Sequence, residues 1–345
     1  MHSGYLEGIV RGYKNSLLSA SAYASLAQCE TLDDLRMQLA ATDYGNFLAD
    51  VPSPISTSTI AERATRKMVA EFEYLRSNAT GDLAKFLDFL TYAYMIDNLI
   101  LLITGTLHEK DTHELLERCH PLGVFESMPA LCVATTVEEL YQSVVVETPL
   151  APYFRECVSA ADLDDLNIEI IRNTLYKAYL EDFYHFCVGL GGTTAESMAT
   201  LLSFEADRRV LNITLNSFGT SLSKEERARL FPTIGRLFPA GNNVLARADD
   251  VEQVKGVCEM IPEYRGFLGG EGTGAGAGET SAEGLEDKMF REETRLNKLE
   301  TITQFQMGIF YSWLKLKEQE IRSITWIAEC ISQNVKDRIS DFVSY

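Results

Sequence analysis

The chain has 345 residues, 46% of them hydrophobic and 23% charged, so it is long and apolar enough to bury a large core and is not a disordered chain. Its formal net charge is −19, and an acidic surface repels nucleic-acid phosphates and anionic lipid headgroups. Nucleic-acid binding and adsorption through a broad basic face are therefore not expected. The charge fits a protein that docks on other proteins.

No targeting or membrane-spanning segment is expected. The start, Met1-His2-Ser3-Gly4, lacks a basic region followed by an apolar run. The most apolar stretch, 99–107, is too short to cross a bilayer, and Asp97 and Asn98 precede it directly. Seven cysteines are scattered without a Cys-x-x-Cys pair, which favours reduced, mostly buried thiols of a cytosolic protein over a disulfide framework.

Helical periodicity dominates the chain. Apolar residues recur every three or four positions between Ile168 and Phe186, and again between Ile321 and Phe342. A short β-branched run at 143–146 directly follows a helical segment, so we do not interpret it as a strand. We therefore predict an all-α fold. Breaks between helices are expected at Pro52 with Pro54, at the glycine cluster 189–192, and at Pro232 with Gly235.

The segment 269–284 alternates Gly with small and acidic residues and has no apolar period, which predicts a flexible surface loop. It matches neither a Walker A motif, because no Gly-Lys-Ser/Thr follows, nor a G-x-G-x-x-G fingerprint after a strand. Phosphate binding is therefore not expected in this loop.

Three segments share one pattern, in which acidic residues open a predicted helix and an aromatic cluster closes the segment. Acids in a first turn complement the helix dipole. The segments are 31–48, 136–154 and 250–268, spaced by about a third of the chain. This spacing indicates an internal repeat.

A second marker, the polar residues Asp97, Asp207 and Glu320, recurs with the same period, and Pro121 with Gly123 parallels Pro232 with Gly235. We predict three pseudo-symmetric helical repeats of about 110 residues, each longer than the units of the common solenoids. They could close into a funnel or ring, or form an open row. The repeats would occupy 1–125 with an N-terminal helix, 126–236, and 237–345 with the Gly-rich loop.

The recurring acids lie on or beside apolar helix faces, and Arg209 and Arg322 follow two residues after their acids. Residues two apart do not face each other on a helix, so each arginine is expected to meet an acid on a neighbouring element. One interpretation is structural pairs between repeats, which add geometric specificity more than stability. The other is a polar lining that grips a partner. The candidate partner-binding residues are Asp97, Asp207, Arg209, Glu320 and Arg322.

No catalytic constellation stands out. His108, His113 and His120 lack the H-E-x-x-H spacing of a zinc site. The enzyme alternative is an all-α prenyl-diphosphate synthase, which needs paired carboxylates to hold magnesium on diphosphate. The pairs Asp33-Asp34, Asp164-Asp165 and Asp249-Asp250 lack the further Asp of such a site, and acids in first helical turns explain them. We expect no cofactor, no metal and no catalytic residues.

Strings along nearly the whole chain resemble the V-type ATPase subunit d family. They are Leu-Asp-Asp-Leu (32–35), Thr-Asp-Tyr-Gly-Asn-Phe-Leu (42–48), Arg-Cys-His-Pro-Leu-Gly (118–123), Glu-Thr-Pro-Leu-Ala-Pro-Tyr-Phe (147–154), Asn-Ile-Glu-Ile-Ile-Arg-Asn (167–173), Leu-Tyr-Lys-Ala-Tyr-Leu-Glu-Asp-Phe-Tyr (175–184), Phe-Glu-Ala-Asp-Arg-Arg (204–209), Glu-Tyr-Arg-Gly-Phe-Leu (263–268), Lys-Glu-Gln-Glu-Ile-Arg (317–322) and Trp-Ile-Ala-Glu-Cys-Ile (326–331). Two departures are a shortened start at Met1-His2-Ser3 and an expanded Gly-rich loop.

The resemblance implies a three-lobed helical funnel that is peripheral to the cytoplasmic face of a vacuolar or other endomembrane. In that family the subunit sits on the proteolipid rotor ring, receives the central-stalk subunits D and F, and passes rotation between them without hydrolysing ATP. A generic helical scaffold unrelated to a rotary motor is the alternative from a different class. Co-purification with proteolipid and stalk subunits would separate the two.

Overall fold

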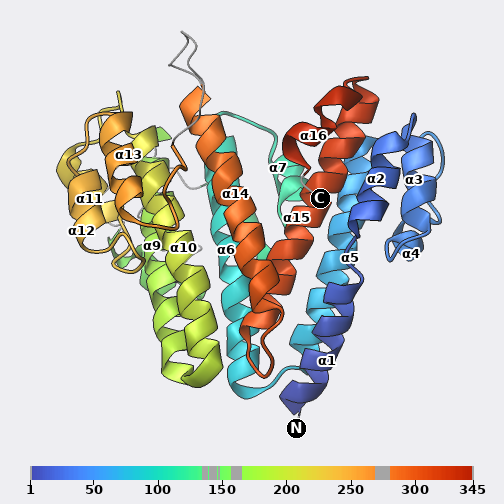
Figure 1. The fold of residues 1–345 in the computed structure, drawn as a ribbon, viewed down its shortest axis with the longest axis horizontal. Helices are drawn as coiled ribbons and strands as arrows, with labels where there is room; N and C mark the ends of the chain where they lie inside the picture. The colour runs from blue at the N-terminus through green and yellow to red at the C-terminus, as the bar shows by residue number, and fades with distance from the viewer. Residues whose placement is uncertain are drawn as a thin grey trace. The chain divides into compact units, whose positions relative to one another are not determined.

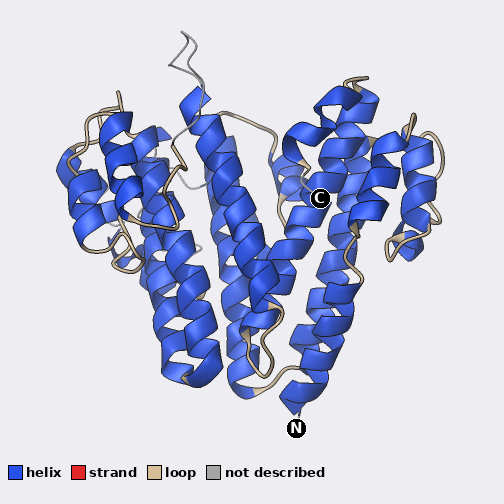
Figure 2. Cartoon of the chain, viewed as in Figure 1, coloured by secondary structure: helices blue, strands red, loops and turns tan. Residues whose placement is uncertain are grey.

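The computed structural model describes residues 2–133, 139, 146, 148–156, 165–268 and 280–343. Within these ranges the chain consists of helices joined by loops and turns, without a strand (Figure 2). The all-α prediction is confirmed. Of the β-branched run 143–146, only Val146 belongs to the described residues.

The chain divides into two compact units, and the boundaries between them fall inside helices α6 and α14. Unit 1 combines residues 1–87 with 294–345, and unit 2 comprises 88–293. The three predicted repeats, 1–125, 126–236 and 237–345, concern internal similarity and stay a prediction.

Unit 1 brings the two ends of the chain together. Its elements are α1 (His2–Asn15), α2 (Ala20–Gln28), α3 (Leu32–Ala40), α4 (Gly45–Leu48), α5 (Thr57–Asn78), the start of α6 (Gly81–Leu107), the end of α14 (Thr280–Glu300), α15 (Gly308–Ser332), the 3-10 turn η5 (Lys336–Arg338) and α16 (Ile339–Phe342). Helix α15 packs on α5 and on α1 (Figure 1). The apolar period predicted from Ile321 to Phe342 is interrupted after Ser332, where α15 ends, and its last residues lie in α16. Its part in α15 supplies buried residues such as Ile324 and Ile327.

Unit 2 is built on the pair α9 (Asp165–Leu190) and α10 (Gly192–Asn216), which pack together along their length (Figure 1). The break predicted at 189–192 is present: Gly191 and Gly192 adopt φ of 71° and 57°, a conformation that favours glycine. The other elements are the rest of α6, α7 (Thr112–Arg118), η1 (Pro121–Gly123), η2 (Met128–Val133), η4 (Ala151–Glu156), α11 (Lys224–Leu230), α12 (Ala240–Leu245), α13 (Val251–Met260) and most of α14.

The predicted loop 269–284 is too long at its C-terminal end. Residues 269–279 lie outside the described residues, but α14 begins at Thr280, so 280–284 are helical. The alternation with glycine pauses after Gly278, and Ala282 and Glu283 are good helix formers.

Helix α6 is long and apolar enough to cross a membrane by length and composition, the one helix of this kind in the described part of the chain. However, 56% of its most apolar window is buried inside the protein. Core helices of soluble proteins pass the same test. Asp88 and Asp97 lie within α6 as well.

Candidate functional site

Two of the five predicted site residues, Asp97 and Arg209, are brought together in unit 2 by a residue that the sequence did not single out. The hydroxyl of Tyr176 on α9 donates a hydrogen bond of 2.6 Å to Asp97 Oδ1 on α6. The guanidinium of Arg209 on α10 stacks on the Tyr176 ring, 3.3 Å from its centroid. Such a cation–π contact stabilises by about 1 kcal/mol when half-buried. Tyr176, which lies on α9, therefore contacts α6 through its hydroxyl and α10 through its ring.

The ion pairs of Arg209 correct one expectation. Its acid is Glu205, one turn earlier on the same helix, with Nε 3.4 Å from Oε1, and not an acid on a neighbouring element. Glu205 also accepts from Arg208 at 2.6 Å, and Arg208 lies 3.8 Å from Glu293 on α14. The neighbouring element contributes the aromatic face of Tyr176 instead. Because Glu205 is buried, two arginines compensate one enclosed carboxylate.

Asp207 points the other way and is fully enclosed. Its carboxylate accepts hydrogen bonds from the backbone amides of Arg236 and Leu237, at 2.9 and 3.1 Å, and from the Tyr264 hydroxyl. Burial raises the pKa of Asp207 to about 6, although these donors oppose the shift. A Cβ at Gly235, where φ is 107°, would overlap Asp207. The loop can therefore approach Asp207 this closely only if residue 235 is glycine.

Asn98, the residue after Asp97, has contacts that resemble those of Asp207. Asn98 is buried and accepts from the backbone amide of His120 at 2.7 Å. Gly123 lies against Asn98 as Gly235 lies against Asp207. Asp97 is exposed. Asp97 and Asp207 therefore have different surroundings, and their match as repeat positions stays a prediction.

Glu320 lies in unit 1, where it is enclosed on α15. It accepts from the Lys317 ammonium at 2.9 Å, from the Tyr44 hydroxyl at 2.6 Å and from the backbone amide of Leu18. Lys317 is itself buried, lies 4.3 Å from the centre of the Tyr44 ring, and was missed by the sequence interpretation. Its position three residues before Glu320 was the available signal.

A second buried lysine, Lys67 on α5, completes the charged core of unit 1. Its ammonium pairs with Glu71 one turn later and with Asp43 at 2.6 Å. Burial raises the pKa of Glu71, and hydrogen bonding to the Lys67 ammonium lowers that of Asp43 despite desolvation. Nothing in the apolar period of α5 distinguished Lys67 from a solvated lysine.

The fifth predicted residue, Arg322, lies on an exposed position of α15. It is two residues from Glu320 but shares none of the three contacts named above for that acid. Three of the five candidates lie in unit 2 and two in unit 1. Asp97 and Arg209 belong to one cluster, Asp207 and Glu320 each hold a loop, and Arg322 faces solvent.

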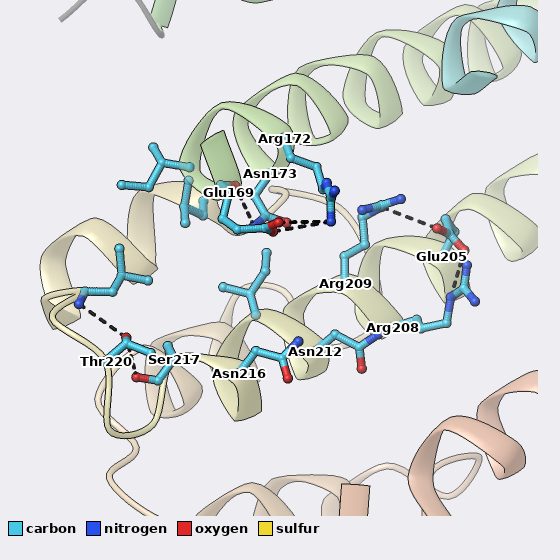
Figure 3. Close-up of a pocket in the computed structure, with 14 residues that line it drawn as sticks. Glu169, Arg172, Asn173, Glu205, Arg208, Arg209, Asn212, Asn216, Ser217 and Thr220 are labelled. Carbon is cyan, nitrogen blue, oxygen red and sulfur yellow. Dashed lines mark hydrogen bonds and ion pairs between the residues drawn. The ribbon is translucent and has the colours of Figure 1, made fainter. Parts of the chain in front are cut away.

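A polar cavity of about 360 Å³ opens beside Arg209 in unit 2 (Figure 3). Helices α9 and α10 form its walls. Side chains that carry charge or hydrogen-bonding groups dominate the lining: Glu169, Arg172, Asn173, Glu205, Arg208, Arg209, Asn212, Asn216, Ser217 and Thr220. Apolar side chains of both helices and the following loop close the remainder.

Described members of two of the acid pairs weighed for a magnesium site have local roles. Asp34 forms a capping box with Thr31 at the start of α3, and Asp250 caps α13. Asp249 pairs with Lys224 at 2.7 Å, while Asp164 lies outside the described residues. Among the residues that the structure describes, no three histidine, cysteine or acidic side chains are grouped as metal ligands.

The family model of the ATP synthase (C/AC39) subunit matches residues 6–342, nearly the whole chain. The chain therefore belongs to the ATP synthase (C/AC39) subunit family.

Within that family the chain is similar to proteins named V-type proton ATPase subunit d. The relative from Neurospora crassa is 56% identical, with 100% of this chain and 98% of the relative aligned. The relative from Dictyostelium discoideum is 52% identical, with 99% and 94% aligned. The relative from Saccharomyces cerevisiae is 49% identical, with 99% and 97% aligned.

Proposed function

We propose that this chain is the non-catalytic coupling subunit of a V-type proton-translocating ATPase. The observation that carries the proposal is the full-length similarity, 56% identity to a V-type proton ATPase subunit d with both chains covered almost completely. In this role it links the central-stalk subunits D and F to the proteolipid rotor ring. It transmits torque while ATP is hydrolysed elsewhere in the complex.

The buried polar contacts support a mechanical role. A body that passes torque must resist deformation, and each loop held by an enclosed carboxylate has one defined position. Asp207 fixes the loop at 236–237, and Glu320 fixes the turn at Leu18. Buried polar groups of this kind specify geometry more than they add stability.

The predicted partner contacts divide by accessibility. Asp207 and Glu320 are enclosed by the chain, so we propose that they act on a partner only through the loops they hold. Asp97 and Arg322 are exposed and Arg209 is half-buried, so partner contact remains proposed for these three. By the same proposal the protein is peripheral on the cytoplasmic face of a vacuolar or other endomembrane, touching the membrane through the ring.

Co-purification tests the proposal. An affinity-tagged chain is expected to isolate proteolipid and central-stalk subunits from solubilised membranes, and its depletion is expected to abolish ATP-driven acidification of the vesicles. Isolation of the tagged chain without any proton-ATPase subunit would contradict the proposal and favour an unrelated helical scaffold.

A further inference from the structure

The cavity between α9 and α10 is a positive island on an acidic protein. Three arginines, Arg172, Arg208 and Arg209, line it together with two acids, Glu169 and Glu205. Counting only these lining side chains, the cavity carries one positive charge; Glu293, 3.8 Å from Arg208, does not line it. Guanidinium groups around a cavity favour an anionic occupant.

The arginines retain unused hydrogen-bonding capacity. Arg172 meets Glu169 through Nη1 alone, at 3.1 Å, while its Nε is enclosed without a hydrogen-bond partner. The Nε of Arg209 is likewise enclosed without a hydrogen bond, although it lies 3.4 Å from Glu205. Figure 3 shows Arg172 from α9 and Arg209 from α10 extending into the space between the two helices. The two Nε atoms have almost no accessible surface, so an occupant of the cavity would be bound by the terminal nitrogens of Arg172 and Arg209, whose side chains are 40% and 21% exposed.

The rest of the lining defines the size and character of the occupant. A volume of about 360 Å³ fits one or two amino-acid side chains rather than a folded segment. The amide of Asn216 is exposed at the cavity, and Ile213 and Leu230 add apolar surface. A carboxylate with a short aliphatic stem matches both the polar and the apolar part of the lining. Guanidinium groups bind carboxylates through paired hydrogen bonds, and the stem would contact the apolar side chains.

We propose that this cavity receives an aspartate or glutamate side chain from a partner polypeptide in the same complex. The inference rests on the proposed function for the existence of that complex. A phosphate dianion fits less well, because Glu169 and Glu205 stand in the wall and would repel the second charge. Arg209 is then a direct binding residue, and Tyr176 positions its guanidinium.

A photo-cross-linker placed at Asn216 in the purified, assembled proton ATPase tests this assignment. The expected product is a cross-link to another subunit whose attached segment carries Asp or Glu within a residue or two of the cross-linked position. Arg172→Gln is expected to lower its yield about tenfold, the loss typical for one charge-assisted hydrogen-bond pair. Arg172→Lys keeps the charge without the planar fork and should give an intermediate yield, even if Arg172→Gln does not fold.

Arg66→Gln is the matched control, since Arg66 also pairs with an acid on its own helix, Glu62, and does not line the cavity. Its cross-link yield should equal that of the unmodified chain. Two results would overturn the inference: no cross-link, or one to a segment without acids, in a complex that assembles normally. Arg172-dependent binding of inorganic phosphate to the isolated chain, without a partner cross-link, would also overturn it. Failure of the proposed function is distinct, because no complex would then be isolated.

Discussion

Asp207 is an enclosed carboxylate whose protonation is coupled to folding. Burial raises its pKa from 3.8 to about 6 in the folded chain, while the unfolded chain retains the ordinary value. Between these two pH values the folded state holds a proton that the unfolded state has released. The contribution of Asp207 to the free energy of unfolding is therefore full below about pH 4 and is lost as the pH rises through about 6.

Asp207→Asn is expected to remove this pH dependence. The unfolding free energy of the unmodified chain, minus that of the variant, should increase by roughly 2 kcal/mol as the pH falls from 7.5 to 4.5. Urea denaturation of both proteins at the two pH values measures it, and groups that titrate alike in both cancel in the difference. A difference that stays constant or decreases toward acid pH would mean that the pKa of Asp207 is not raised by burial.

Arg209 and Arg322 occupy corresponding places in the sequence but different surroundings in the structure. Arg209→Glu loses the stack on Tyr176 and places a second acid one turn from Glu205. It should lower the free energy of unfolding by about 2–4 kcal/mol, whereas Arg322→Glu, at an exposed position, should change it by less than about 0.5 kcal/mol. Urea unfolding of the isolated chain distinguishes the two.

The same pair of variants also tests partner contact. In the assembled complex we expect Arg209→Glu to impair assembly or rotation-coupled proton pumping. An effect of Arg322→Glu on assembly, with unchanged stability of the isolated chain, would place Arg322 at an interface. Normal assembly and pumping in both variants would remove both arginines from the set of partner-binding residues.

The residue pattern predicted the important polar positions more successfully than it predicted the contacts that these residues make. Asp207 and Glu320 stood out because an acid on an apolar helix face is unusual, and both are buried. Their backbone donors could not be found this way, since the amides of Leu237 and Leu18 have no sequence signature, whereas the spacing of Lys317 to Glu320 was a signal that the pattern search did not use. The buried contact of Asn98 with His120 was likewise not predicted, because the search weighed charged residues.

At the scale of helices, α15 carries charge into the core of unit 1. Lys317 and Glu320 lie three residues apart on it, and both are almost completely buried. Removing one partner of such a pair leaves an uncompensated charge, whereas replacing both by apolar residues is often neutral. The pair therefore serves to position α15 against the α3–α4 segment that carries Tyr44.

Lys317→Met is expected to lower the free energy of unfolding by about 3–5 kcal/mol, because Glu320 then remains buried without its cation. The double variant Lys317→Met with Glu320→Leu should recover most of that loss. Chemical denaturation of the single and double variants checks this. Equal stability of Lys317→Met and the unmodified chain would show that Glu320 is neutral or solvated in the folded protein.

Helix existence was predictable and helix limits less so. The apolar period gave α9 and the C-terminal part of α15, and glycines marked the break at 191–192 because only they adopt its φ values readily. The start of α14 was missed, since the composition of 269–284 was treated as uniform although the alternation with glycine stops after Gly278 and Ala282 and Glu283 are good helix formers. Local propensity decides such boundaries, and an averaged composition hides it.

At the scale of the whole molecule, unit 1 is assembled from both ends of the chain. Helix α15 packs on α5 and α1, and its buried residues Trp313 and Ile324 belong to the same core as Phe72. No sequence pattern showed this pairing, because periodicity reports that a helix has an apolar face and not which helix covers it. Unit 2, by contrast, is continuous in sequence.

Ending the chain after Met307 removes α15 and should unfold unit 1 while unit 2 persists. Helix α5 would then lose the surface that covers Phe72 and leave Lys67 in an opened core, so its amides should lose protection from hydrogen–deuterium exchange. The amides of α9 and α10, whose main packing partners in the described part of the chain lie within 88–293, should stay protected.

Ile302→Ser provides the control for this truncation, because Ile302 lies near the cut and is 73% exposed. Exchange in α5 should match that of the unmodified chain. Persistent protection of α5 after truncation would mean that residues 1–87 hold their own core. Simultaneous loss of protection in α9 and α10 would instead mean that the two units unfold as one cooperative body, so that the stiffness needed for torque transmission arises from the entire chain and not from each unit separately.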